Sequence, residues 1–348
     1  MMRSLYSAIS GLKNHQTRMD VIGNNIANVN TVGYKTSRTV FQDIFSQTMS
    51  GGMANNINAG IGGTNPIQIG LGIRLSSIDV LHTRSAFQST GVAFDMMING
   101  DGFFVTGKIN DAGIAYALDK IDNDEPYVIA DKDYYDLLYT RAGNFKLDDE
   151  GYLTTSDGRY VLGYTADIIF TQGDPSADPS TPDLFWFDED SIEPIDPSRL
   201  SRIRLSIDEF SYLLDDTGAV ATPAAGTIFP GDLIGFSVGQ DGSVSVLLNG
   251  EYQTVARLAV AMFSNDGGLM KQGNSFYAET KSSGSAVITA PLQSGSGEIM
   301  GGGLEMSNVD LSAEFTDMIV TQRGFQANAR TITVSDTLLE ELINLKRN

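Results

Sequence analysis

The 348-residue sequence contains no cysteine and only two histidines. Without cysteine there is no disulfide, thiolate metal site or cysteine nucleophile. Two histidines cannot form a three-histidine metal site, and the sequence contains no His-Glu-x-x-His pattern. A phosphate-binding Gly-x-x-x-x-Gly-Lys loop is also missing. The sequence therefore predicts that the protein is not an enzyme and has no catalytic residues, metal ligands or cofactor.

Basic residues are few: 23 Lys and Arg stand against 43 Asp and Glu, for a net charge of −20. This balance argues against a general nucleic-acid binder, which needs cationic side chains to displace counterions from phosphates. The charge is also uneven along the chain. Residues 1–50 carry a net charge of +3, whereas residues 107–200 hold seven basic and 21 acidic residues, a net charge of −14. The acidity therefore belongs to the middle of the chain.

Long apolar runs are missing as well. No stretch approaches the roughly 20 apolar residues that span a bilayer, so we expect no membrane insertion. After Arg3, the first apolar segment is interrupted by Ser7, Ser10, Gly11 and Lys13, whereas a secretory signal needs an apolar core of about 7–15 residues. The Sec route is therefore not expected, and the protein is either cytosolic or exported by another machine.

Both ends of the chain carry a seven-residue apolar repeat. At the N-terminal end the repeat consists of Leu5, Leu12, Met19 and Ile26, and at the C-terminal end of Leu311, Met318, Phe325, Ile332 and Leu339. A row of this spacing lies on one face of a helix. Two interpretations remain open: amphipathic helices packed on their own globular domain, or a coiled coil that joins the two chain ends and packs against other subunits. Neutral amides on the polar faces favour the second, because they form hydrogen bonds across contacts without the desolvation cost of an ion.

The middle of the chain has the pattern of antiparallel strands. Apolar residues alternate from Ile67 to Leu75, which predicts a half-buried strand. Asn-Gly and Asp-Gly pairs at 99–102, 157–158, 241–242 and 249–250 are typical of hairpin turns. The Gly/Asn-rich stretch 50–65 indicates a connector.

Two acidic stretches, 107–138 and 167–230, have the composition of insertions. Clusters at 122–125 and 148–151 leave a secreted Ca²⁺-binding module as an alternative from another class. Neither cluster has the twelve-residue ligand loop of an EF-hand, and a solvated acidic turn is the simpler interpretation.

The two ends also carry long motifs. One runs from Asp20-Val-Ile-Gly-Asn-Asn-Ile-Ala-Asn-Val-Asn to Thr31-Val-Gly-Tyr-Lys35, and the other includes Ser307-Asn-Val-Asp-Leu and Gln322-Arg-Gly-Phe-Gln-Ala-Asn328. In this order they closely resemble the signatures of the bacterial flagellar axial proteins, the rod and hook family. Within that family, residues 62–72 and the ending 338–347 are most similar to hook subunits of the short Gram-positive type. Distal rod subunits share the termini and remain the alternative.

The resemblance implies an α+β multidomain fold. The N- and C-terminal helices would pair as an α-helical coiled-coil domain that forms an inner tube, followed by a mainly antiparallel β middle domain with an inserted acidic subdomain. The expected division is 1–34 with 305–348 (terminal helices), 35–66 (connector), 67–166 with 231–304 (β-rich domain) and 167–230 (outer insertion). Such a subunit would self-assemble into a curved, hollow joint that passes torque from the motor and rod to the filament.

The implied partners are other copies of the chain, the distal rod, hook cap and hook–filament junction proteins, and the flagellar export apparatus. The implied location is the flagellum at the cell surface. The residues expected to act in assembly are Leu5, Leu12, Met19, Asn24, Asn25, Ile26, Asn28, Gly33, Tyr34, Asn308, Leu311, Met318, Gln322, Arg323, Phe325, Asn328, Ile332 and Leu339.

Overall fold

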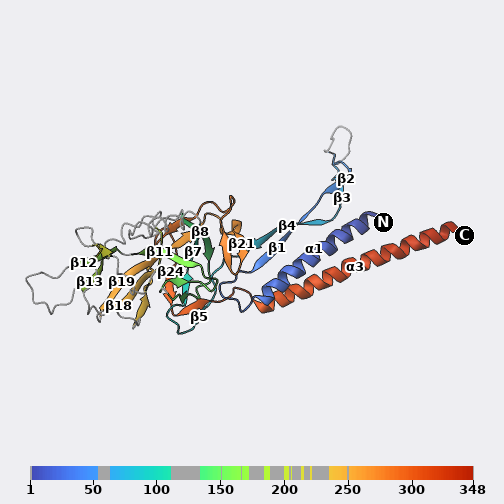
Figure 1. Ribbon diagram of the computed structural model, residues 1–348. Coiled ribbons are helices and arrows are strands. Elements are labelled where there is room, and N and C mark those ends of the chain that lie inside the picture. Colours follow the sequence, from blue (N-terminus) through green and yellow to red (C-terminus); the bar gives the residue numbers. More distant parts are fainter. Residues whose placement is uncertain are drawn as a thin grey trace, which may run out of the picture. The chain divides into compact units, whose positions relative to one another are not determined.

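The computed structural model (Figure 1) divides into two compact units. The first unit comprises Met1–Asn30, Lys35–Thr83 and Asn308–Asn348, and the second comprises Thr31–Tyr34 and Arg84–Ser307. The structure describes residues 2–53, 63–110, 134–149, 151–165, 167–171, 184–188, 200–203, 205, 213–214, 220–221, 235–248 and 251–347.

Two long helices dominate the first unit: α1 (Met2–Ala27) and α3 (Leu311–Arg347). At about 1.5 Å per residue, α3 is about 55 Å long and α1 about 39 Å. Asp310 caps the start of α3, because its Oδ1 accepts hydrogen bonds from the backbone N–H groups of Ser312 (2.8 Å) and Ala313 (3.3 Å). Both helices predicted from the apolar repeat are therefore present, one at each end of the chain.

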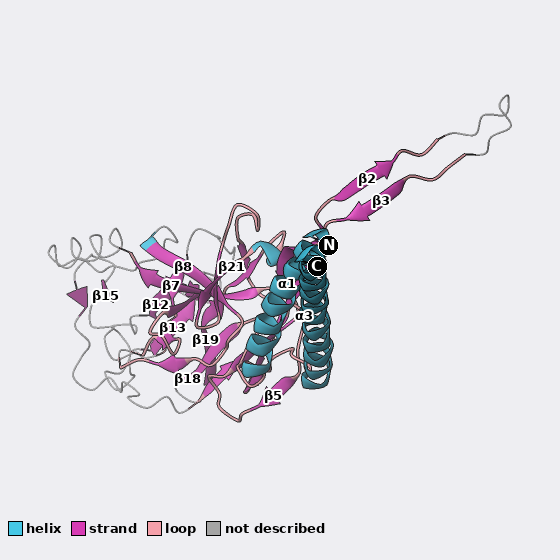
Figure 2. Ribbon diagram, turned by 90° about the vertical axis from the view of Figure 1, so that its right-hand side faces the viewer, coloured by secondary structure: helices cyan, strands magenta, loops and turns pink. Residues whose placement is uncertain are grey.

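The rest of the first unit is a pair of antiparallel ladders (Figure 2). Strand β1 (Ser37–Asp43) pairs with β4 (Ile73–Val80), and β2 (Ser46–Ser50) pairs with β3 (Ile67–Gly70). The strand predicted for 67–75 is interrupted at Gly72, whose φ is +125°. A Cβ at Gly72 would clash with the Ser10 hydroxyl of α1, so the helix dictates where this strand breaks.

The second unit is built on a large sheet. Among the described residues every strand pairing is antiparallel, and the main sheet has 13 strands with the central order β17-β18-β19-β11-β7-β8-β22-β21. Its strands are β7 (Phe103–Ile109), β8 (Tyr135–Thr140), β9 (Lys146–Leu147), β10 (Leu153–Thr154), β11 (Tyr160–Thr165), β14 (Ser201–Arg202), β17 (Phe236–Val238), β18 (Ser243–Leu248), β19 (Glu251–Leu258), β20 (Val260–Met262), β21 (Met270–Gly273), β22 (Phe276–Ala278) and β23 (Val287–Thr289).

Four smaller pairs complete the described strands of this unit. They are β5 (Phe87–Ser89) with β25 (Gly303–Glu305), β6 (Met96–Asn99) with β24 (Glu298–Gly301), β12 (Asp167–Thr171) with β13 (Leu184–Asp188), and β15 (Leu213–Leu214) with β16 (Val220–Ala221).

Strand β7 shows why the main sheet is stable. Phe103, Phe104 and Val105 are all fully buried, but Phe104 belongs to one apolar cluster and its two neighbours to another. Because successive side chains of a strand point to opposite faces, the sheet has a core on both sides. This explains why the strand is a continuous apolar run and does not alternate.

Two hairpin turns predicted from Asp-Gly pairs are confirmed. Gly158 and Gly242 have positive φ values and lie between the paired strands β10 and β11 and the paired strands β17 and β18. The prediction at 99–102 is wrong, because β6 pairs with β24 and β7 pairs with β8, β11 and β20. β18 and β19 pair up to Leu248 and Glu251, although Asn249 and Gly250 lie outside the described residues. Most of both acidic stretches, including the 122–125 cluster, also lies outside them. The chain is thus mainly antiparallel β with a helix near either end, and none of the described helices is long and apolar enough to cross a membrane.

Candidate assembly interface

The helices α1 and α3 lie side by side and run antiparallel. Arg18 of α1 pairs with Asp317 of α3 at 3.0 Å. Farther along α1, Asn25 donates to Glu314 at 2.9 Å, so positions rise on one helix as they fall on the other. The ion pair is solvent-exposed and contributes at most about 1 kcal/mol, which leaves packing to hold the helices together.

Glycine on each helix allows this close packing. A Cβ at Gly11 would lie 2.7 Å from the Asn328 amide nitrogen, and one at Gly324 would lie 2.8 Å from the His15 ring. His15 also lies edge-on to Phe41 of β1, with ring centroids 6.4 Å apart. Burial lowers the pKa of His15, and the nearby charge of Arg18 lowers it further. Both effects favour the neutral form of the imidazole.

Most residues of the predicted apolar rows are shielded from solvent. Leu5, Leu12, Met19 and Ile26 are all partly buried, as are Met318, Phe325, Ile332 and Leu339, whereas Leu311 is 39% exposed. A second row on α3 completes the packed face three residues farther on, and it is small and polar. Its buried members Thr321 and Ser335 donate back to carbonyls of their own helix, at 2.7 Å and 2.8 Å. Sequence reasoning missed Thr321 and Ser335 because neither is a large apolar residue.

One asparagine of each motif forms hydrogen bonds with backbone groups at the end of the β1–β4 ladder. Asn25 is buried, donates to the Ser37 carbonyl at 2.9 Å and accepts from the Ser37 N–H at 3.0 Å. Asn308 accepts from the Thr36 N–H at 2.7 Å and donates to the Leu81 carbonyl at 2.8 Å. Both amides therefore join the β1–β4 ladder to a chain end within one subunit.

The other predicted polar residues are more accessible. Asn24, Gln322 and Arg323 are exposed, and Asn28 and Asn328 are partly buried. Gly33 and Tyr34 belong to the second unit. The helical residues of the predicted set belong to the first unit, as does Asn308.

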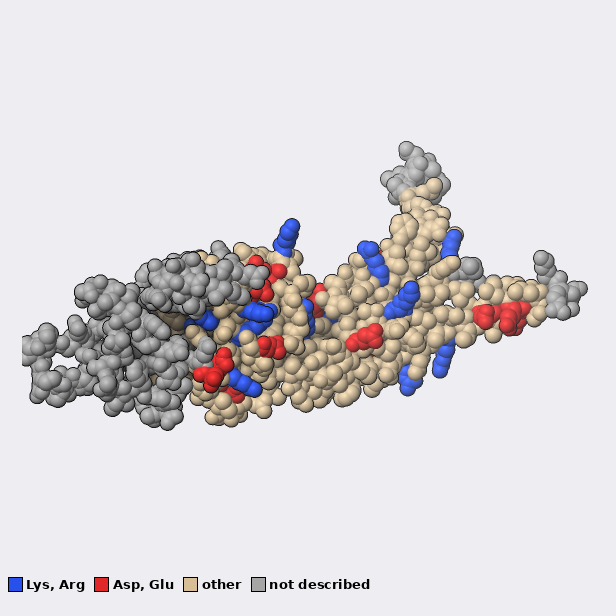
Figure 3. All heavy atoms as spheres, viewed as in Figure 1, with Lys and Arg blue, Asp and Glu red and all other residues tan. Residues whose placement is uncertain are grey.

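The first unit also exposes many large apolar side chains that the heptad rows do not include. On the helices they are Tyr6, Ile9, Phe315, Ile319, Val320, Val334, Leu338, Leu342, Ile343 and Leu345, and on the strands and their connections Ile44, Phe45, Met49, Met53, Ile67, Ile69 and Ile78. We call this set the assembly surface. Figure 3 shows that uncharged residues make up most of the visible surface of the helices and the β2–β3 ladder. Exposed apolar surface of this extent marks an interaction site. The sequence already indicates this exposure, because α3 contains more apolar residues than a single buried stripe of a helix can include.

Three family models match different parts of the chain. The model described as "Flagella basal body rod protein" matches residues 5–35, "Flagellar hook protein FlgE/F/G D1 domain" matches 127–246, and "Flagellar basal body rod FlgEFG protein C-terminal" matches 300–345. The first and third cover the segments of α1 and α3 that form the packed pair.

Similar proteins match the chain from end to end. The flagellar basal-body rod protein FlgG of Bacillus subtilis is 41% identical over 350 positions, which cover the whole of both chains. The flagellar hook protein FlgE of Borreliella burgdorferi is 32% identical over 468 positions, covering 99% of this chain and all of that protein. FlgE of Treponema pallidum is 32% identical over 467 positions, with full coverage of both. The chain therefore belongs to the flagellar rod and hook protein family and is a structural subunit of the bacterial flagellum.

Proposed function

We propose that the chain is the subunit of the flagellar hook and polymerises into the joint between rod and filament. The observation that carries self-assembly is the assembly surface, whose members include Ile319 at 59% and Ile343 at 64% exposure. An apolar face of this kind is costly in water and is covered when copies pack together. A contact between different faces of successive copies continues indefinitely and so generates a helical polymer.

We further propose that α1 and α3 form a coiled coil that lines the channel of the polymer. The support is the row of four seven-spaced residues on each helix that is partly buried in the contact. The domain division proposed from the sequence is 1–34 with 305–348 for the inner tube, 35–66 for the connector, 67–166 with 231–304 for the β-rich shell and 167–230 for an acidic outer subdomain. The compact units differ from this division, because residues 35–83 belong to the unit of the helices and residues 31–34 to the β-rich unit. The assembly residues proposed from the sequence then divide by role. The apolar rows would hold the pair together, and Asn24, Gln322 and Arg323 would contact neighbouring subunits from their exposed positions.

The partners proposed for this subunit are other copies of itself, the distal rod, the hook cap and the hook–filament junction proteins. Export would proceed through the flagellar export apparatus, without a Sec signal, to the outside of the cell. The support for this route is membership of the flagellar rod and hook family.

The distal rod is a second candidate function. It is favoured by the name of the Bacillus subtilis relative, a rod protein aligned over 350 positions. The alignment with the Borreliella hook protein extends over 468 positions, 120 more than the residues of this chain. The hook assignment instead rests on the likeness of residues 62–72 and 338–347 to hook subunits.

Negative-stain electron microscopy of polymer assembled from the purified full-length chain separates the two. Curved tubes support the hook, and short straight tubes support the rod. A chain that stays monomeric under every assembly condition contradicts both.

A further inference from the structure

Four residues that follow α1 leave the first unit and enter the second. Asn30 and Lys35 belong to the helical unit, whereas Thr31–Tyr34 between them belongs to the compact unit formed with Arg84–Ser307. We call Thr31–Tyr34 the plug. A loop that only connects neighbouring elements does not have to pack against another unit. The plug, by contrast, makes contacts in the second unit.

Gly33 is the most constrained residue of the plug. It is buried with φ +65°, and its N–H donates to the Glu305 carbonyl at 2.9 Å. A Cβ at this position would lie 2.7 Å from the Ala142 nitrogen and 2.8 Å from the Arg141 carbonyl carbon. Both are backbone atoms, which cannot swing aside as the end of a side chain can. Glycine is therefore required here by conformation and by space together.

A buried ion pair fixes the two backbone segments that hold Gly33. The Arg141 and Glu305 side chains are 1% and 0% exposed, with Nη1 and Oε2 3.6 Å apart. The Arg141 guanidinium lies 5.2 Å from the centre of the Phe103 ring, and Glu305 Oε1 accepts from the Ser85 N–H at 3.3 Å. Burial lowers the pKa of Arg141, while the carboxylate of Glu305 acts against this. Removing one partner would leave an uncompensated buried charge, so each holds the other in place.

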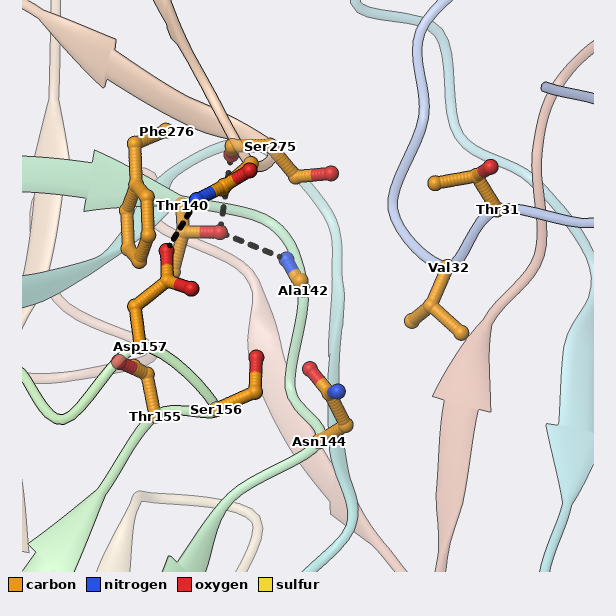
Figure 4. A pocket seen from close by; sticks show the side chains of 11 residues that line it. Thr31, Val32, Thr140, Ala142, Asn144, Thr155, Ser156, Asp157, Ser275 and Phe276 are labelled. Carbon is orange, nitrogen blue, oxygen red and sulfur yellow. Dashed lines mark hydrogen bonds between the residues drawn. The ribbon is translucent and has the colours of Figure 1, made fainter.

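The other residues of the plug also contact the second unit. The Lys271 ammonium lies 4.8 Å from the centre of the Tyr34 ring, within cation–π range. Thr31 and Val32 face Ala142 and Asn144 across an open cavity of about 310 Å³ (Figure 4). Gly33 is the residue of the plug whose replacement would clash with backbone atoms of the second unit.

We infer that the plug pins the N-terminal segment to the β-rich unit, with Gly33 as the contact and Arg141 and Glu305 as positioning residues. The chain also passes between the units at 83/84 and 307/308. The plug adds a non-covalent attachment to these passages, so force carried along α1 enters the β-rich unit at Gly33 as well. That mechanical consequence rests on the proposed hook function, whereas the attachment itself does not.

Hydrogen exchange of the full-length soluble chain, read by mass spectrometry, tests the attachment with a matched pair of variants. Gly33→Ala and Gly91→Ala both place a side chain at positive φ, +65° and +71°, but Gly91 has no atom within 4 Å of the added Cβ. We expect amides 33–34 and 141–142 to exchange at least tenfold faster in Gly33→Ala, with wild-type rates at the same amides in Gly91→Ala. Protection of β7 and β19 reports that the sheet is intact in both. Equal rates at amides 33–34 in the two variants would overturn the inference.

A second comparison applies if Gly33→Ala does not fold. Glu305→Gln removes the ion-pair partner of buried Arg141, and we expect faster exchange at amide 33. Adding Arg141→Met removes the Arg141 charge, and we expect exchange at amide 33 to return toward the wild-type rate. A double variant that exchanges faster than the single variant contradicts a positioning role for the pair. Because both comparisons use the unpolymerised subunit, their outcome does not depend on whether the polymer is a hook or a rod.

Discussion

Two glycines of α1 have opposite surroundings, although the sequence presents them as equals. Gly23 has no atom within 4 Å of an added Cβ, whereas a Cβ at Gly11 would meet the Asn328 side chain. Gly23→Ala should therefore gain the full helix-propensity difference, about 0.8–1 kcal/mol in the free energy of unfolding. Gly11→Ala should gain less than this or lose stability, because Asn328 must move away from α1. Urea unfolding followed by helical circular dichroism reports the difference, and an equal gain in both variants contradicts the described helix contact.

His15 should make the helix pair sensitive to acid. Its pKa in the folded chain lies below the usual 6.5, chiefly through burial and secondly through Arg18. Folded and unfolded chains are both neutral at this site above pH 6.5, so stability there is unaffected. As the pH falls below 6.5 the unfolded chain binds the proton first, and stability declines until the folded pKa is passed.

We expect the melting temperature of the first unit to fall more between pH 7.5 and pH 5.5 in the wild type than in His15→Gln. Gln keeps a polar side chain but does not titrate, so a wild-type response in this variant would show that another group is responsible.

At the scale of single residues, the sequence motifs include Asn25 and Asn308 but do not predict which groups these side chains bind. Asn25 and Asn308 belong to the family motifs, but their hydrogen-bond partners are Ser37 of β1 and Leu81, the residue that follows β4. A sequence motif identifies its own residues, but it does not show which atoms of the rest of the chain lie next to them after folding. The buried pair of Arg141 and Glu305 shows the same limit, because 164 positions separate its members.

The β1–β4 ladder depends on α1 for part of its hydrogen bonding. Asn25→Ala removes the bonds to the Ser37 carbonyl and to Glu314, and it leaves the Ser37 N–H without its acceptor. Because these groups are buried or partly buried, we expect a loss of about 2–3 kcal/mol in the free energy of unfolding. Asn24→Ala, at the exposed neighbouring position, should change it by less than about 0.5 kcal/mol. Chemical denaturation of both variants is the measurement, and equal losses would contradict the role of the buried amide.

Periodicity predicts elements well where one face of an element is buried against a single partner. The helices follow this rule, and so does the alternation that becomes β3 and β4. It fails to predict the break at Gly72, because that break is imposed by Ser10 of α1, and the pattern of a strand contains no information about a helix 60 residues away. The polar row at Thr321 and Ser335 was missed for a related reason, since close helix packing selects small side chains as well as apolar ones.

The charge distribution and the assembly surface belong to the whole molecule. The sequence places the excess acid at 107–200 and little net charge at the N-terminal end. The structure adds that the helices expose apolar side chains beyond those in their mutual contact. Composition could predict that charge is scarce there. It could not predict which apolar side chains remain uncovered, because that depends on the side from which each helix meets its partner.

A single charge on the assembly surface should therefore separate folding from polymerisation. Ile319 is 59% exposed in the subunit, so Ile319→Asp should change the free energy of unfolding by less than about 1 kcal/mol. In the polymer the carboxylate would be repeated at every copy and buried without a partner, a cost of several kcal/mol per subunit. We expect sedimentation assays to find no polymer for Ile319→Asp and normal polymer for the control Ile319→Leu, which keeps the side chain apolar. Polymer formation by the folded Asp variant at the wild-type critical concentration would place this face of α3 outside the subunit contact, and the remaining exposed apolar side chains would then have to hold the polymer together.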